Sequence, residues 1–457
     1  MSGKLVHPVV EGGKGVGVST GATAGAFAAA GAVGTFSGVN AASYDQDGKP
    51  IPYIYKGATR RDRHEELVDL SIKGGIAQAK IAHEISNGNG RIHMNILWEM
   101  GGAERVMRGV LEGAPGMVHG VTCGAGMPYK LGDLAAHYNV YYHPIISSAR
   151  AFNALWKRAY NKTSQWLGSV VYEDPWLAGG HNGLSNAEDP EKPQDPYPRV
   201  AELRKTLNSF GLQETPIIMA GGAWHLSEWE HWLDNPEIGP IAFQFGTRPI
   251  LTQESPVSQD WKAKLMQLEE GDVFLNKFSP TGFYSSGVNN NFIKELRGRS
   301  DRQIEYRTEQ EGLFSEPLPI GARGRPVYVQ PDDKARAESW IAAGYAEGMK
   351  TPDSTLIFVS PERAKQIVVD QIECMGCLSH CAFSNWKDHD DFTTGKKADP
   401  RSFCIQKTLQ DVIGGAPVDN QLMFSGHNAY RFKSDPFYAN GFVPTVEQLV
   451  KRILSGY

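Results

Sequence analysis

Short apolar runs rich in β-branched residues recur along the first 255 residues, and a stretch with helical periodicity follows most of them. A continuous apolar run is typical of a strand buried on both faces of a parallel sheet. Eight runs alternating with helices predict a (β/α)₈ TIM barrel, and a doubly wound open sheet is the alternative. The predicted strands are His7–Val10, Ala32–Ser37, Arg91–Leu97, Met117–Thr122, Val140–Pro144, Gly168–Glu173, Pro216–Ala220 and Pro240–Phe245. The predicted helices are Glu65–Ile85, Leu131–His137, Ala149–Tyr160, Arg199–Phe210, Leu226–Leu233 and, near the end of the chain, Thr445–Leu454.

This alternation stops after Ser255. Residues 256–370 mix polar helical pieces with connections rich in Pro and Gly, such as Pro317–Gly321, and a cysteine-rich region follows. The loop Asn182–Pro198 is too long for a simple connection in a barrel, so we expect it to border the active site. The expected organisation is a barrel over residues 1–255, a lid with the cysteine region over 256–419, and a C-terminal segment over 420–457 whose helix returns to the barrel.

The composition is that of an ordinary globular protein, since 41% of residues are hydrophobic and 21% charged. A net charge of −5 argues against nucleic acid or an anionic membrane as the main partner. Residues 16–39 carry no charge, but Gly, Ala, Ser and Thr dominate them, which favours tight β–α–β packing over a membrane span. No basic stretch followed by an apolar core begins the chain, so the sequence predicts no signal peptide and a cytoplasmic location.

Glycines are concentrated where the last three predicted strands end. The pairs are Gly179–Gly180, Gly221–Gly222 and Gly246–Thr247. In a barrel these loops share the C-terminal face, where active sites form and where the last two loops commonly bind phosphate. Glycine lets backbone amides approach an anion closely. Each pair alone is more often a turn, but three at consecutive strand ends predict a phosphate-binding site.

The sequence around these glycines resembles the FMN-dependent nitronate monooxygenase (2-nitropropane dioxygenase) family. The runs Pro216–Gly222 and Gly239–Arg248 carry the resemblance together with Ala178–His181, and it extends over residues 6–256. The flavin enoyl-acyl-carrier-protein reductases share this signature. The resemblance implies FMN, with Asn95 at the isoalloxazine edge and His181 as the active-site acid or base. It also implies that the phosphate is held by amides around Gly179, Gly180, Gly221, Gly222, Gly246 and Thr247.

Two departures from the family pattern argue against nitronate oxidation. Nitronate monooxygenases usually carry a histidine in the loop after the fourth strand, whereas here Val121–Gly126 has none and is similar to the enoyl reductases. The first strand reads Pro8–Lys14 where the family commonly has a Pro-Met pair. Cys123 lies in the loop that would face the flavin, although a lone cysteine at a strand end is most often a small buried residue.

Four of the five cysteines fall in one region, which in a chain without a secretion signal indicates a metal. Cys374, Cys377 and Cys381 have the spacing C-x₂-C-x₃-C, and Cys404 follows. Thiolates at this spacing can hold an inorganic cluster, whereas zinc ribbons normally use two C-x₂-C pairs. The string resembles the dienoyl-CoA reductase group, in which a [4Fe–4S] cluster passes electrons to FMN. A structural zinc ion and the absence of a metal are the alternatives, and Cys404 is the least secure ligand.

We therefore expect an oxidoreductase containing FMN and a [4Fe–4S] cluster, acting on a small-molecule or acyl-type substrate. NAD(P)H, a quinone or an electron-carrier protein are the candidate redox partners, and the enzyme is a candidate homo-oligomer. The first alternative is a true nitronate monooxygenase that uses O₂. The second is a flavin-binding scaffold without activity, held together by zinc.

Overall fold

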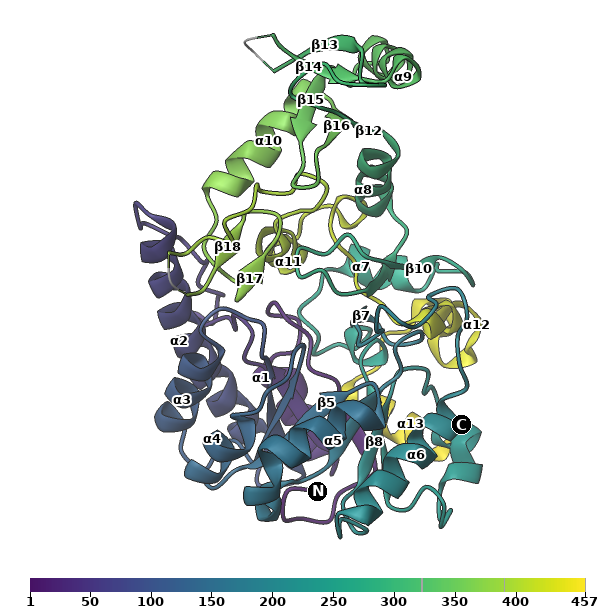
Figure 1. Cartoon of the computed structure of the whole chain (residues 1–457). Helices are drawn as coiled ribbons and strands as arrows, with labels where there is room; N and C mark the ends of the chain where they lie inside the picture. The colour runs from purple at the N-terminus through teal and green to yellow at the C-terminus, as the bar shows by residue number, and fades with distance from the viewer. Residues whose placement is uncertain (322–323, 390, 457) are drawn as a thin grey trace.

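The computed structural model describes residues 1–321, 324–389 and 391–456, and eight parallel strands form a closed barrel in it (Figure 1). The barrel strands are β1 (Val9–Glu11), β2 (Val33–Ser37), β3 (Arg91–Leu97), β4 (Gly120–Gly124), β5 (Tyr141–Ile146), β6 (Val170–Glu173), β8 (Ile217–Ala220) and β9 (Ile241–Phe245). β1 pairs with both β2 and β9, which closes the sheet on itself. Each strand overlaps a predicted one, so the TIM-barrel prediction is confirmed and the open sheet is excluded.

Helices surround the barrel (Figure 1). They are α1 (Gly21–Ala29), α2 (Arg60–Ser86), α3 (Ala103–Gly113), α4 (Leu131–His137), α5 (Ala149–Arg158), α6 (Pro196–Ser209) and α13 (Val446–Ser455). α2 begins five residues before its predicted start because Thr59 and Asp62 form a capping box. α13 buries Val446, Leu449 and Ile453 in the same core as α1.

The helix expected at Leu226–Leu233 is instead the 3₁₀ segment η3 (Leu226–Trp232), so this prediction was wrong in helix type. Trp229 has non-helical backbone angles, and its ring packs against Trp232 and Phe243 with centroid distances of 4.8 and 5.3 Å. The backbone kink at Trp229 interrupts the regular hydrogen bonding that an α-helix would need here. The other 3₁₀ segments are η1 (Tyr160–Lys162), η2 (Ser164–Trp166), η4 (Arg248–Ile250), η5 (Val418–Asn420), η6 (His427–Tyr430) and η7 (Pro436–Gly441).

The uncharged segment 16–39 forms α1 and β2 in tight contact with α2. A Cβ atom on Gly25 would lie 2.6 Å from Ile85 Cβ, and one on Gly34 would collide with the carbonyl oxygen of Ala24. Small residues are therefore needed because two helices and a strand approach closely here. Among the described residues, no helix has both the length and the apolarity needed to cross a bilayer.

Residues 256–419, called the lid region below, stand on one end of the barrel (Figure 1). Its strands are β10 (Val273–Asn276), β11 (Ser285–Val288), β12 (Gln303–Glu305), β13 (Glu316–Ile320), β14 (Arg325–Val329), β15 (Glu347–Lys350), β16 (Thr355–Val359), β17 (His380–Cys381) and β18 (Trp386–Lys387). Its helices are α7 (Gln259–Leu265), α8 (Asn291–Asp301), α9 (Pro331–Ala342), α10 (Pro361–Ile372) and α11 (Ile405–Ile413), and α12 (Arg431–Ser434) follows. β11 also pairs with β7 (Gly180–His181), which leaves the barrel after β6.

The Pro-rich connection expected at Pro317–Gly321 is largely a strand, which corrects the sequence-based prediction. β13 pairs with β14 alone in a two-stranded sheet, and Pro317 and Pro319 lie opposite Tyr328 and Pro326. Proline lacks an amide donor and is tolerated at sheet edges. A two-stranded sheet consists only of edges, so these prolines are compatible with it.

Two stacked histidines fill the N-terminal end of the barrel. His93 and His143 are fully buried with ring centroids 4.2 Å apart, and Ser2 Oγ lies 2.9 and 3.0 Å from their Nε2 atoms. Burial lowers the pKa of His143 to about 3 and lowers that of His93 well below its usual value. Both rings are therefore neutral at pH 7.

We expect the free energy of unfolding to fall as the pH drops below about 6.5, the pKa of histidine in an unfolded chain. The unfolded chain then binds protons that the folded one does not, at a cost of about 2 kcal/mol per histidine between pH 6.5 and 5. Urea unfolding at a series of pH values measures this slope. The His143→Gln variant should have a shallower slope, while the control His7→Gln, at an exposed residue, should keep it. An unchanged slope in His143→Gln would contradict the prediction.

Candidate active site

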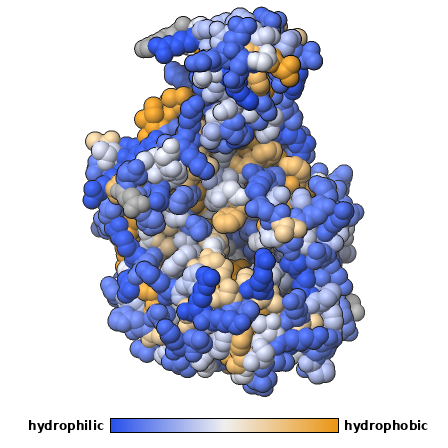
Figure 2. Space-filling model, viewed as in Figure 1, coloured by the Kyte–Doolittle hydropathy of each residue, from blue (hydrophilic) through white to orange (hydrophobic). Residues whose placement is uncertain are grey.

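A cavity of about 500 Å³ lies at the C-terminal end of the barrel, between the strand ends and the lid region. This volume is in the range of cofactor and substrate pockets. Figure 2 shows apolar residues gathered in the depression between the two parts of the molecule. On the lid side the wall is apolar and includes Trp261, Ile405, Leu409, Val412, Leu422 and Phe424. Of the long loop expected to border the active site, Asn182 and Gly183 line this cavity.

All six predicted phosphate-binding residues line this one cavity. They are Gly179, Gly180, Gly221, Gly222, Gly246 and Thr247. Gly221 and Gly222 have φ angles of +91° and +85°, a conformation that other residues rarely adopt. A Cβ atom on Gly246 would have no neighbour within 4 Å, so its backbone faces open space. The strand ends therefore present bare backbone to the cavity, as an anion site requires.

The C-terminal segment completes the glycine-lined part of the cavity, which sequence reasoning did not foresee. Gly426 donates its amide to Thr247 Oγ1 at 2.9 Å, and Asn428 Nδ2 donates to the carbonyl of Gly222 at 2.6 Å. Both residues line the cavity. Segments far apart in the sequence thus fix the positions of Gly222 and Thr247.

A buried ionic network lies beside these loops. Arg248 donates to the hydroxyl of Tyr438 at 3.0 Å and lies 3.8 Å from the carboxylate of Asp435. Asp435 also accepts hydrogen bonds from Trp224 Nε1 at 2.9 Å and Arg452 at 3.1 Å. Burial disfavours the charged form of Asp435, but hydrogen bonds from His225, the Phe437 amide, Trp224 and Arg452 outweigh it and hold its pKa below the usual range. The network joins the loop after β9 to the C-terminal segment.

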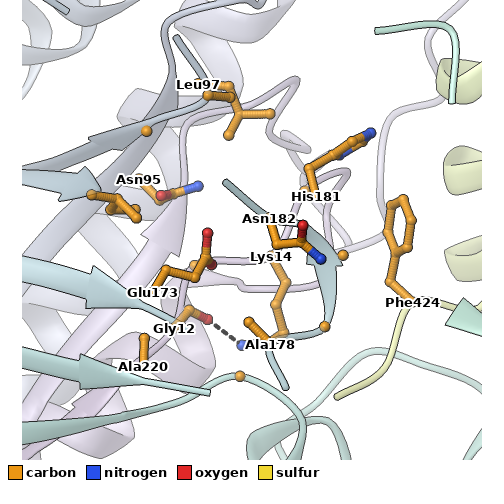
Figure 3. Close-up of a pocket in the computed structure, with 18 of the residues that line it drawn as sticks. Gly12, Lys14, Asn95, Leu97, Glu173, Ala178, His181, Asn182, Ala220 and Phe424 are labelled. Atoms are coloured by element: carbon orange, nitrogen blue, oxygen red, sulfur yellow. Dashed lines mark hydrogen bonds between the residues drawn. The ribbon is translucent and has the colours of Figure 1, made fainter. Parts of the chain in front are cut away.

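The predicted residues Asn95 and His181 enter the cavity from different elements (Figure 3). Asn95 is buried on β3, and a Cβ atom on Gly13 would collide with its side chain. His181 lies on β7, with Nε2 2.6 Å from Ser279 Oγ and its ring edge-on to Phe424. Burial lowers the pKa of His181 to about 4, so the ring is neutral at pH 7. A neutral imidazole can accept or hold a proton at either nitrogen.

The ionisable residues Glu173 and Lys14 line the cavity and were not among the predicted site residues. Glu173 ends β6 and points toward the middle of the cavity (Figure 3), and burial, with a smaller contribution from Asp174, raises its pKa to about 8. Lys14 lies in the loop after β1 and forms an ion pair with Glu11. A signal was present in both cases, because a charged residue at the carboxyl end of a barrel strand faces the active site.

The four clustered cysteines come together in one apolar region beside the cavity. Cys374, Cys377 and Cys381 are buried there, and Cys404 packs against the same cluster. Burial raises the pKa of Cys377, and the other three thiols raise it further. Cys377 and Leu378 also line the cavity, and α11 begins directly after Cys404.

No group of three or more His, Cys, Asp or Glu side chains in the described ranges has the arrangement of a metal-ion site. The [4Fe–4S] cluster therefore stays a prediction. Cys123 is separate from it, buried on β4, where burial raises the pKa of its thiol. A raised pKa makes a thiol unreactive at neutral pH, which agrees with a packing role.

The family model described as nitronate monooxygenase matches residues 1–368 of this sequence. The structure is similar to that of FabK from Thermotoga maritima, with 15% identity, a TM-score of 0.50, and coverage of 98% of this chain and 92% of that chain. It is also similar to the enoyl reductase domain of MlnA from Bacillus amyloliquefaciens, with 12% identity, a TM-score of 0.52, and coverage of 98% and 93%. At these identities the two likenesses show the fold alone. No curated protein matches the sequence.

Proposed function

Because the chain belongs to the nitronate monooxygenase family and is an FMN-dependent oxidoreductase, we propose that it is a reductase or electron-transfer enzyme with a [4Fe–4S] cluster. The cluster would be held by Cys374, Cys377, Cys381 and Cys404. One observation carries the proposal: Cys377 lines the same cavity as the glycine-rich strand ends. A cluster there would lie close enough to FMN to exchange single electrons with it, a step that simple hydride transfer does not need.

The cavity fits FMN in size and in the chemistry of its walls. The bare backbone at Gly221, Gly222 and Gly246 suits a phosphate, and Asn95 can hydrogen-bond the ring edge. When bound, FMN supplies hydride or electron transfer at N5. The apolar wall from α11 would exclude water, and His181 would hold the proton that a substrate gives up or takes up.

The cysteine region has features that suit a cluster. Gly376 has a φ angle of +65°, which lets the chain turn between Cys374 and Cys377. The hydroxyl of Ser384 donates to Cys374 Sγ at 3.1 Å, and the amide of Gly376 lies 3.4 Å from the same sulfur. Hydrogen bonds to sulfur tune the potentials of such clusters. A [4Fe–4S] cluster is wider than a single metal ion, and the four thiolates would reorient toward it on binding.

Metal and sulfide analysis after anaerobic purification tests the proposal. We expect about four iron and four sulfide per chain, with flavin absorbance overlaid by a broad shoulder from the cluster. In Cys377→Ser the iron should be lost and the region around residues 370–410 loosened, while FMN is retained. Cys123→Ala is the matched control, because this cysteine is buried on β4, outside the apolar cluster, and it should keep full iron.

The alternatives give different results in the same samples. Flavin without iron in the wild-type protein would favour a nitronate monooxygenase that uses O₂. One zinc ion and no iron would overturn the redox role of the cysteines. Cys404→Ser tests the identity of the fourth ligand. An unchanged iron content in this variant would mean that a residue other than Cys404 is the fourth ligand.

A further inference from the structure

The pair Glu11–Lys14 lies at the end of β1, and neither residue has a role in the proposed function so far. The carboxylate of Glu11 is fully buried, and the side chain of Lys14 is 15% exposed and lines the cavity. Lys14 Nζ lies 3.3 Å from Glu11 Oε1 and 2.6 Å from the carbonyl oxygen of Gly12. Glu11 Oε2 accepts a further hydrogen bond from the amide of Thr35 at 3.2 Å. A buried pair with these bonds has fixed geometry.

The ammonium group of Lys14 can donate a further hydrogen bond to a ligand in the cavity. It has three donors, and two acceptors, Glu11 and Gly12, satisfy it among the described residues. Its loop also packs against the residue assigned to the flavin ring edge, since a Cβ atom on Gly13 would collide with Asn95. The loop that carries Lys14 therefore packs beside Asn95.

The charges of the other cavity residues make Lys14 distinctive. Among the described residues that line the cavity, the lysine and arginine side chains are Lys14 and Arg248. Arg248 is buried among Tyr438, Trp224 and Asp435, with its guanidinium 4.6 Å from the Trp224 ring centroid. With 15% of its side chain exposed against 1% for Arg248, Lys14 is thus the more accessible of these two cations.

We propose that Lys14 is the cationic group that sets the reduction equilibrium of bound FMN, by stabilising negative charge on the isoalloxazine ring. The inference rests on the proposed function, because it requires FMN in this cavity. Reduction places negative charge on the N1–C2=O edge of the ring, and a nearby cation favours the anionic form. Glu11 then serves as a positioning residue that holds the ammonium in place.

Sulfite titration measures this charge stabilisation without a substrate. The lone pair of sulfite sulfur forms a bond to flavin N5, and the displaced electron pair moves to N1–C2=O, so the visible absorbance of the flavin is lost. In the holoenzyme, Lys14→Met should raise the sulfite dissociation constant by about tenfold to a hundredfold, because the charge is removed at nearly constant side-chain length. Lys14→Arg should stay within about threefold of wild type. Lys451→Met, a control at an exposed lysine on α13, should also stay within about threefold.

A second variant covers the case in which Lys14→Met leaves Glu11 buried without a partner and does not fold. Glu11→Gln/Lys14→Gln removes both charges and keeps hydrogen-bonding groups, and it should weaken sulfite binding to the same extent. Unchanged sulfite binding in a folded variant that retains FMN would overturn the inference. The inference would also be overturned if Lys14→Met lost part of its FMN while the fraction that keeps FMN bound sulfite as the wild type does. A wild-type protein without FMN would instead overturn the proposed function, and the flavin absorbance distinguishes the two failures.

Discussion

Replacing Gly246 with aspartate is expected to abolish FMN binding. The residue lines the cavity, its φ angle is outside the left-handed region, and a Cβ atom there would meet nothing within 4 Å. The variant should therefore fold normally and place a carboxylate where we expect the phosphate. Two unit charges about 4 Å apart repel by about 4 kcal/mol at a protein-like effective dielectric constant, which corresponds to about a thousandfold weaker binding.

The control for this variant is Gly246→Asn, which has nearly the same shape without the charge. Flavin fluorescence after gel filtration and titration of the apoprotein with FMN measure the affinity of both. We expect the Gly246→Asn variant to lose much less affinity for FMN than the Gly246→Asp variant. Equal retention of FMN by both variants would contradict the assignment of the phosphate to this strand end. Gly222 is a less informative position, since its φ angle of +85° would strain any replacement.

Replacing His181 with glutamine is expected to lower turnover by about 10²–10⁴-fold, the range for loss of a general acid or base. Glutamine can keep the hydrogen bond to Ser279 Oγ, so the backbone of β7 and the bound FMN should stay in place. Turnover of the reduced enzyme with a quinone or an enoyl thioester as acceptor, and of the oxidised enzyme with a nitronate and O₂, provides the measurement.

The pH profile gives a second readout for His181. Its pKa of about 4 means that the neutral ring persists as the pH falls from 8 to 5, and activity that needs the neutral ring should decline only as the pH approaches 4. Ser279→Ala is the matched control, because it removes the hydrogen-bond partner and leaves the imidazole, and it should cost less than about tenfold. A loss below about threefold in His181→Gln would mean that the histidine only supports the loop.

The barrel could be predicted because its strands are short runs rich in apolar residues, and several of them, such as β4, β6 and β8, end at or directly before a glycine or a charged residue. Gly246 was predicted from its place at a strand end, since strand ends in a barrel share one face, and His181 from the family resemblance and its place after a glycine pair. The contacts of Gly426 and Asn428 with that face could not be predicted, because they form only when the chain comes back to the barrel after the whole lid region. The segment η3 was predicted as an α-helix because hydrophobic periodicity does not reveal the backbone kink at Trp229.

The contact of α13 with α1 also has a consequence for how the chain folds. The two helices come from opposite ends of the sequence, and the lid region lies between β9 and α13 in chain order. The outer ring of the barrel therefore depends on contacts of very high sequence separation, which slow folding because a long loop must close first. During synthesis, residues 1–255 would leave the ribosome with the apolar surface of α1 and η3 uncovered, and α13 would cover it only after the lid region had also emerged.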